Sequence, residues 1–96
     1  EVSGMIVTAL TKAWREKLGL KEGLAGIIVS SVDDDSPASK KGIAAGDIIV
    51  EAGQKQVKSV AEFNDRVNLA IDSGKSAILL LLRRDGNQRF LALPIK

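Results

Sequence analysis

The chain of 96 residues has the length of one small domain, because domains typically contain about 100–150 residues. Its composition, 45% hydrophobic and 27% charged, is that of a globular protein and excludes a disordered chain. A formal net charge of +2 gives no strong field for nucleic acid. The longest apolar run, residues 77–82, is far shorter than the roughly 20 residues of a transmembrane helix.

Histidine and cysteine are both absent from the sequence. The first absence removes the commonest general base and metal ligand, and the second removes thiol nucleophiles, disulfides and thiolate metal sites. A Ser-His-Asp triad cannot be built from this chain. We therefore expect a binding module rather than an enzyme, with no cofactor and no metal site. Because the chain begins at Glu1 without a leader, we expect it to be a segment of a longer protein.

The first third of the chain is predicted to contain two strands and a short helix. Residues 4–9 include a run of branched apolar side chains and indicate a strand. Thr11 is suited to cap a helix that runs to about Leu18, where a glycine follows. A loop is expected over residues 20–26, and a second strand over residues 27–32.

Turns and short elements occupy the middle of the chain. The three aspartates at 33–35 lack the alternating oxygens, glycine and later glutamate of a calcium loop, so they indicate a solvated turn. Residues 36–37, Ser-Pro, predict an N-cap followed by proline at the first position of a single helical turn, which Gly42 closes. A third strand is expected over residues 48–50 and a brief one at 56–57.

The segment from residue 59 onward carries the clearest helix signal in the sequence. Ser59 and Glu62 form a capping box, in which each side chain accepts a hydrogen bond from the other's backbone amide. The helix is expected to end near residues 72–74. Its apolar face consists of residues at three- and four-residue spacing, namely Val60, Phe63, Val67 and Ile71.

Two further strands are predicted at the end of the chain. Residues 76–83 are almost continuously apolar, which indicates a strand covered on both faces. Asp-Gly at 85–86 indicates a hairpin turn, residues 88–93 alternate, and Pro94 ends the last strand at a sheet edge. Five or six short strands with two main helices predict a single α+β domain over residues 1–96, built on a curled antiparallel sheet.

One glycine is placed differently from those at the turns. Gly4 directly precedes the apolar strand Met5-Ile6-Val7. A glycine at that place lets consecutive backbone amides converge into a nest that can hold a carboxylate. The alternative is a simple loop.

Three segments of the chain form a specific pattern, namely residues 26–32 (GIIVSSV), 36–43 (SPASKKGI) and 45–49 (AGDII). Together they resemble bacterial PDZ domains, in particular those of the HtrA/Do (DegP-like) family of envelope serine proteases. The predicted helix from residue 59 and the strand up to residue 84 continue the resemblance. It implies a PDZ fold of the circularly permuted bacterial type, with its strands in a curled sheet or partial barrel.

The resemblance also implies a site, because this family places its peptide-receiving loop and strand first. The loop would be Val2-Ser3-Gly4-Met5 and the strand Met5-Ile6-Val7. A peptide would add antiparallel to that strand, and its terminal carboxylate would accept hydrogen bonds from amides around Gly4 and Met5. Phe63 and Val67 match core positions. The helix residues expected to face the groove are Val60, Asn64 and Asn68. For the two asparagines, plain exposure to solvent is the alternative.

The implied function is that of a peptide-binding regulatory module in the bacterial periplasm. Its partners would be C-terminal or extended segments of misfolded proteins, and other subunits or domains of a parent serine protease whose catalytic domain is N-terminal. Ser3 stands where the family usually has an apolar residue, which suits the second PDZ domain of two-PDZ members. One alternative is a subunit-docking domain with a vestigial groove. Another is a PDZ domain of a different envelope protein.

Overall fold

The fold is known from a computed structural model that describes residues 2–20 and 25–95. Within them, six strands and three helices follow one another along the chain. These are β1 (Met5–Ala9), α1 (Lys12–Leu18), β2 (Ile27–Val32), α2 (Pro37–Lys40), β3 (Ile48–Ala52), β4 (Lys55–Gln56), α3 (Val60–Asp72), β5 (Ala77–Arg84) and β6 (Asn87–Pro94). The predicted α+β class is confirmed, and the predicted loop at 20–26 lies mostly outside the described residues.

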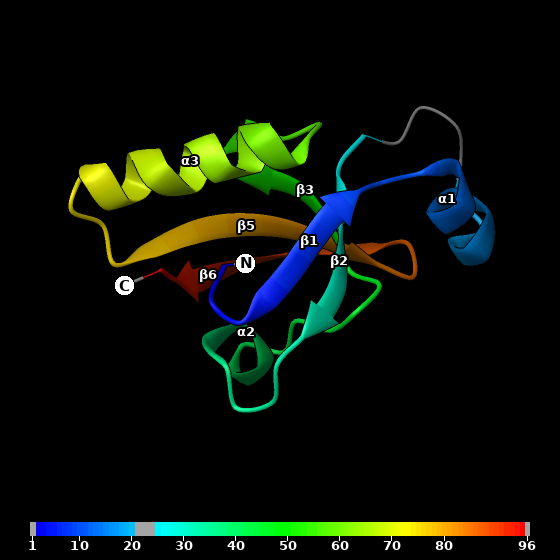
Figure 1. Cartoon of the computed structure of the whole chain (residues 1–96), viewed down its shortest axis with the longest axis horizontal. Coiled ribbons are helices and arrows are strands. Elements are labelled where there is room, and N and C mark those ends of the chain that lie inside the picture. Colours follow the sequence, from blue (N-terminus) through cyan, green and yellow to red (C-terminus); the bar gives the residue numbers. More distant parts are fainter. Residues whose placement is uncertain (1, 21–24, 96) are drawn as a thin grey trace.

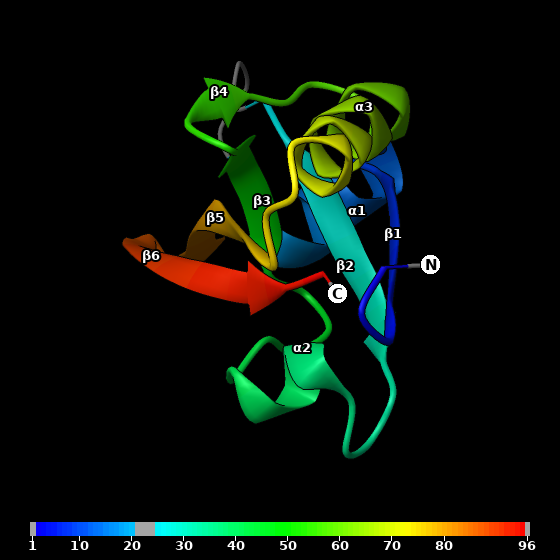
Figure 2. The same cartoon turned by 90° about the vertical axis from the view of Figure 1, so that its left-hand side faces the viewer.

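All strands join one antiparallel sheet in the order β1-β2-β3-β5-β6, with β4 paired to β3. The sheet is open, so β1 and β6 each have one edge without a partner strand among the described residues. Figures 1 and 2 show α3 across one face of the sheet, α1 at one end of β1, and α2 near its other end. The edge of β1 therefore lies next to α3.

Both faces of the central strands are covered, by clusters of different size. The larger cluster lies under α3, where Phe63 is fully buried against the sheet. Ile27 and Val29 of β2 face this cluster. Ile28 between them faces the smaller cluster on the opposite side, which Trp14 of α1 helps to cover. Since successive side chains of a strand alternate between faces, the apolar run of β2 serves both clusters.

The helix termini form by local hydrogen bonds, as the sequence predicts. Thr11 accepts a hydrogen bond from the amide three residues on, and Gly19 ends α1 with a φ of 65°. Ser36 caps α2 in the same way, followed by Pro37. These caps confirm the predicted starts of both helices, because each hydroxyl binds an amide that the helix leaves unpaired.

The capping box of α3 differs from the prediction in one bond. The Ser59 hydroxyl accepts a hydrogen bond from the Glu62 amide at 3.1 Å, as expected. The Glu62 carboxylate, however, accepts from the amide of Lys58 at 2.9 Å rather than from that of Ser59. The predicted reciprocal bond was wrong by one residue, since the side chain reaches the preceding peptide group.

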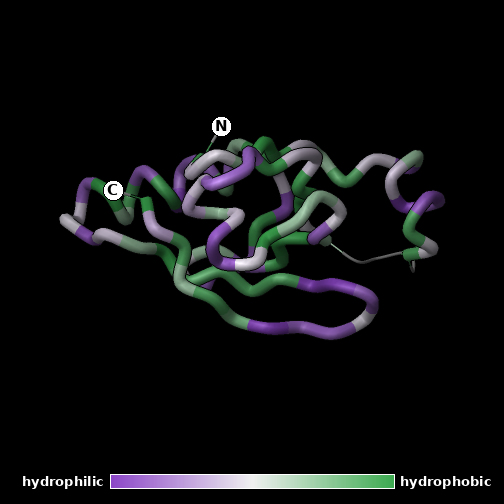
Figure 3. Tube along the Cα trace, turned by 90° about the horizontal axis from the view of Figure 1, so that it is seen from below, coloured by the Kyte–Doolittle hydropathy of each residue, from purple (hydrophilic) through white to green (hydrophobic). Residues whose placement is uncertain are grey.

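Two predictions of burial were too broad. Ile71 was placed on the apolar face of α3, yet it is 47% exposed and lies in the last turn of that helix. The predicted second cover of β5 is incomplete, since Ala77 and Leu79 are half-buried and only Leu81 is buried on that face. Figure 3 shows the β5–β6 hairpin with hydrophilic residues at its turn and the adjoining strand ends, and mainly apolar residues farther along both strands.

A buried acid fixes the turn before β3. Asp47 is 2% exposed, and its carboxylate accepts hydrogen bonds from the amide of Ala44 at 3.0 Å and from Arg84 at 2.6 Å. Hydrogen bonding and charge from Asp47 raise the pKa of Arg84. The aspartate of the AGDII segment therefore links this turn to the end of β5.

The short strand β4 begins one residue earlier than predicted, at Lys55.

Candidate functional site

The chain enters β1 through a tight turn at residues 2–5. The Val2 amide donates to the Met5 carbonyl at 3.0 Å, and the Met5 amide donates back to the Val2 carbonyl at 2.9 Å. The two central residues, Ser3 and Gly4, have φ values of 53° and 87°. Positive φ at both central positions is the requirement of a type I′ hairpin turn, in which glycine is favoured at the second position.

This turn is held in place by α2 and by the segment that precedes it. The Gly4 carbonyl accepts from the Asp33 amide at 2.8 Å, and the Ser3 carbonyl accepts from the Ala38 amide at 3.1 Å. A Cβ atom on Gly4 would lie 2.2 Å from the Cβ of Ser36, the cap of α2. Gly4 is therefore required by its backbone conformation and by close packing.

The same turn leaves backbone donors unused. The carbonyls of Ser3 and Gly4 both accept hydrogen bonds, whereas their amides have no acceptor within residues 2–20 and 25–95. The amide of Met5, by contrast, is already bonded within the turn. Two successive backbone amides in such a turn form a concave group of donors that suits an anion.

A cavity of about 360 Å³ lies beside this turn, between it and α3. Its apolar lining comes from Val2, Val67, Ile71 and Ile95, and its polar lining from Ser3, Asn64 and Asn68. None of these side chains is titratable, so the cavity offers no general acid or base. It is suited to hold an apolar side chain beside polar amide groups.

The nine predicted site residues are distributed along the edge of β1 and the facing side of α3. Four of them, Val2, Ser3, Asn64 and Asn68, line the cavity. The side chain of Met5 is fully buried in the main cluster, and that of Ile6 is exposed. The remaining residues, Gly4, Val7 and Val60, lie at the turn, on β1 and at the start of α3, and the two valines pack against the main cluster.

Three cavity residues were not among those predicted. Val67 was assigned to the core and Ile71 to the apolar face of the helix, although their spacing from Asn64 places all three on one stripe of α3, a signal that the sequence contains. Ile95 follows β6 and reaches the cavity only because β6 ends beside the turn at residues 2–5. Nothing in the sequence near residue 95 indicates that contact.

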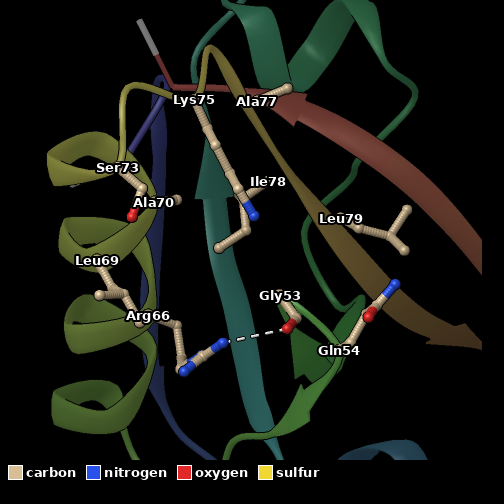
Figure 4. Close-up of a pocket in the computed structure, with 10 residues that line it drawn as sticks. All are labelled: Gly53, Gln54, Arg66, Leu69, Ala70, Ser73, Lys75, Ala77, Ile78 and Leu79. Carbon is tan, nitrogen blue, oxygen red and sulfur yellow. Dashed lines mark hydrogen bonds between the residues drawn. The ribbon is translucent and has the colours of Figure 1, made fainter.

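A second cavity, of about 280 Å³, lies where α3 meets β5 and the turn after β3 (Figure 4). Arg66 spans it and donates a hydrogen bond to the Gly53 carbonyl at 3.1 Å, while Lys75 extends over it from the loop after α3. Leu69 contributes an exposed apolar side chain. None of the predicted site residues lines this second cavity. Because it also borders α3, it can be compared with the cavity beside the turn at residues 2–5.

No group of three or more metal-ligating side chains occurs in the described part of the chain. Of the helices described, none combines the length and hydrophobicity that crossing a bilayer requires.

Comparison with known proteins agrees with this geometry. A family model described as PDZ domain matches residues 4–95. The chain belongs to the PDZ domain family. Since the match extends over almost all of the chain, this segment is a PDZ module, as the sequence predicts.

Sequence relatives point to one branch of PDZ-containing proteins. The chain is 46% identical, over 70 residues, to a probable periplasmic serine endoprotease DegP-like of Bartonella henselae, which covers 73% of the chain and 14% of the relative. It is 37% identical over 93 residues to the protein of the same description from Rickettsia prowazekii, covering 97% of the chain and 17% of the relative. The PDZ module thus spans less than a fifth of the length of these curated relatives.

Solved structures agree with the sequence relatives. The HtrA3 PDZ domain bound to a phage-derived ligand (FGRWV) has a TM-score of 0.75 at 25% identity, covering 95% of this chain and 80% of that one. The HtrA-type protease AlgW with decapeptide has a TM-score of 0.70 at 28% identity, covering 96% and 27%. The predicted PDZ fold and its HtrA/DegP-like character are therefore confirmed.

Proposed function

We propose that this PDZ domain binds the C-terminal segment of a peptide by strand addition to the free edge of β1. The observation that carries the proposal is the pair of amides at Ser3 and Gly4 that have no acceptor among the described residues, next to a cavity lined by apolar and uncharged polar side chains. A chain terminus presents both matching groups, because its carboxylate and its last side chain are joined at one Cα atom. An internal peptide segment has no main-chain carboxylate for the amides.

In this arrangement the peptide lies antiparallel to β1, between that strand and α3. Its carboxylate accepts hydrogen bonds from Ser3 and Gly4, in place of the predicted pair Gly4 and Met5, and its last side chain enters the cavity. Side chains two residues apart in a strand point the same way, about 6.6 Å apart. The third side chain from the end therefore approaches Val60, one helical turn before Asn64. Hydrogen bonding between the two backbones sets which residues of the peptide and of β1 lie opposite one another, and the cavity selects the last side chain of the peptide.

The domain would serve a larger protein as its peptide-binding regulatory module. We propose a parent that is a DegP-like serine endoprotease of the periplasm, for which the relatives' descriptions and the HtrA structural neighbours give support. Its ligands would be C-terminal or extended segments of misfolded proteins. The proposal also includes contacts with other subunits or domains of the parent. It further includes the position of this domain as the second PDZ domain of that parent.

Titration of matched peptides tests the binding mode. Each peptide, with an apolar last residue, is prepared as free acid and as amide and titrated by calorimetry, because Trp14 lies in the smaller cluster and not in the cavity. We expect micromolar binding of the acid, and at least about tenfold weaker binding of the amide, or 1.4 kcal/mol.

The other outcomes have distinct meanings. Equal binding of acid and amide would indicate strand addition without recognition of the terminus. No binding at millimolar peptide would contradict the proposal and leave subunit docking as the better account of the domain.

A further inference from the structure

The second cavity, where α3 meets β5 and the turn after β3, carries positive charge. Arg66 lines it from α3, and Lys75 lines it from the loop that follows α3 (Figure 4). The other polar side chains of its lining, Gln54 and Ser73, are uncharged. Among the described residues that form this lining, every charge is therefore positive, although the whole chain has a net charge of only +2.

No carboxylate in the described part of the chain neutralises these two cations. Neither Arg66 nor Lys75 takes part in an ion pair there. Glu62 lies one helical turn before Arg66, but its carboxylate accepts a hydrogen bond from the Lys58 amide. Asp72, three residues before Lys75, likewise forms no ion pair with a described residue. The cavity therefore presents two cations to a ligand from outside.

Arg66 is held by backbone carbonyls, yet more than half of its donors remain available. Its Nε donates to the Ala52 carbonyl at 3.4 Å, and its Nη2 donates to the Gly53 carbonyl at 3.1 Å. A Cβ atom on Gly53 would lie 3.1 Å from Nη2, so a glycine at that turn leaves room for the guanidinium. A guanidinium has five N–H donors, and three of them, including both on Nη1, have no acceptor among the described residues.

Aliphatic side chains lie beside these cations. Ala70 and Ile78 are buried parts of the main cluster, and Leu69 is 52% exposed. A small inorganic anion would match the cations but not the apolar part of the lining. A carboxylate at the end of a short aliphatic chain matches both, and the side chains of glutamate and aspartate have this chemistry.

We propose that the second cavity binds an acidic side chain from a segment of a partner protein. The carboxylate accepts hydrogen bonds from Arg66 and pairs with the ammonium group of Lys75, while its methylene groups contact Ala70 and Ile78. This cavity and the one beside the turn at residues 2–5 share α3 but no lining residue. The inference thus goes beyond the proposed function and does not depend on it.

Peptides with both ends blocked test the proposal, because they have no terminal carboxylate for the turn at residues 2–5. A short peptide with one glutamate next to a leucine is titrated against the isotope-labelled domain, followed by nuclear magnetic resonance. We expect it to shift the amide signals of Gly53 and Lys75 and the Nε–H signal of Arg66. The same peptide with glutamine in place of glutamate should bind about tenfold more weakly, because it loses the charge-assisted hydrogen bonds.

Lys75→Gln removes one cation from the cavity at an exposed position, so the fold is expected to persist. Binding of the glutamate peptide should weaken by about threefold, on the scale of an exposed ion pair. Lys41→Gln is the matched control, since it removes the same charge at an exposed lysine that lines neither cavity. We expect the control to bind as the unchanged domain does.

Each contrary outcome overturns the inference in its own way. Equal binding of the glutamate and glutamine peptides would show that the cavity does not recognise charge. Equal weakening by Lys75→Gln and Lys41→Gln would reduce the attraction to net charge. Shifts at Asn64 and Asn68 alone would place the peptide in the other cavity, a result that concerns the proposed function. Shifts caused by inorganic phosphate but not by the glutamate peptide would indicate a site for free anions only.

Discussion

At the scale of single residues, Gly4 meets two requirements that can be measured separately. Its φ of 87° lies in the left-handed region, which costs an L-residue about 1–2 kcal/mol. Its α-carbon also lies so close to Ser36 that an added Cβ would stand 2.2 Å from a side-chain carbon. The first requirement belongs to the turn itself, and the second to its packing on α2.

Gly4→Ala is therefore expected to destabilise the domain by about 3 kcal/mol, the sum of backbone strain and steric overlap. Gly74→Ala is the matched control, because Gly74 has a φ of 80° and an added Cβ there would meet no atom within 4 Å. The control should lose only about 1 kcal/mol, from backbone strain alone. Urea unfolding of both variants measures the difference, and equal losses would show that Gly4 is not packed closely against Ser36.

At the scale of elements, the ion pair of Asp47 and Arg84 joins the turn before β3 to the end of β5. The acid is buried, whereas Arg84 is 46% exposed. Arg84 and Arg89 both donate to the Gly42 carbonyl as well, at 2.8 and 3.0 Å. The loop from α2 to β3 is thus held against the hairpin β5–β6 by polar contacts.

Asp47→Asn should lower the free energy of unfolding by about 2–3 kcal/mol, because it removes the charge that Arg84 binds. Glu16→Gln is the control, since its pair with Lys12 is exposed and 4.0 Å long, and a change within about 0.5 kcal/mol is expected. Chemical unfolding measures both. A similar loss in the two variants would contradict the structural role assigned to Asp47.

The pH dependence of this pair follows from the raised pKa of Arg84. A cation whose pKa is raised by folding stabilises the folded state below its unfolded pKa, and that stabilisation is lost only as the pH rises through the folded value. For arginine both values lie in the strongly alkaline range. The charge of Arg84 therefore adds no pH dependence at neutral or mildly alkaline pH.

At the scale of the whole molecule, the two phenylalanines allow the core to be compared with the surface, because one is buried and the other is exposed. Phe63 is fully buried between α3 and the sheet, whereas Phe90 on β6 is 60% exposed. The core otherwise consists of aliphatic side chains and Met5, so a single aromatic ring fills its centre.

Phe63→Ala is expected to cost about 3–5 kcal/mol, a large part of the stability of a domain of this size. Phe90→Ala should cost about 1 kcal/mol or less, because most of its ring is already in water. Thermal and urea unfolding measure both losses. Should Phe63→Ala not fold, Phe63→Leu provides the comparison with Phe90→Leu, and equal losses at the two positions would contradict the assigned core.

Local structure was predictable wherever it depends on neighbours in sequence. Thr11, Ser36 and Ser59 each cap a helix through an amide three residues on, so short motifs indicate them. The alternation and apolar runs of the strands likewise reflect the period of an extended chain. The capping bond of Glu62 shifted by one residue because a flexible side chain can reach either of two adjacent amides.

The sequence by itself determined the fold class, the antiparallel strands and the helix starts, since these follow from local hydrogen bonding and hydrophobic period. The two sides of the proposed groove were predicted only through the resemblance to PDZ domains. Only the tertiary structure decided that Ile95 completes the cavity and that Ser3 binds Pro94. It also decided that Asp47 binds Arg84 rather than water. Such contacts join segments far apart in the chain, and they exist only after the sheet has brought its strands into order.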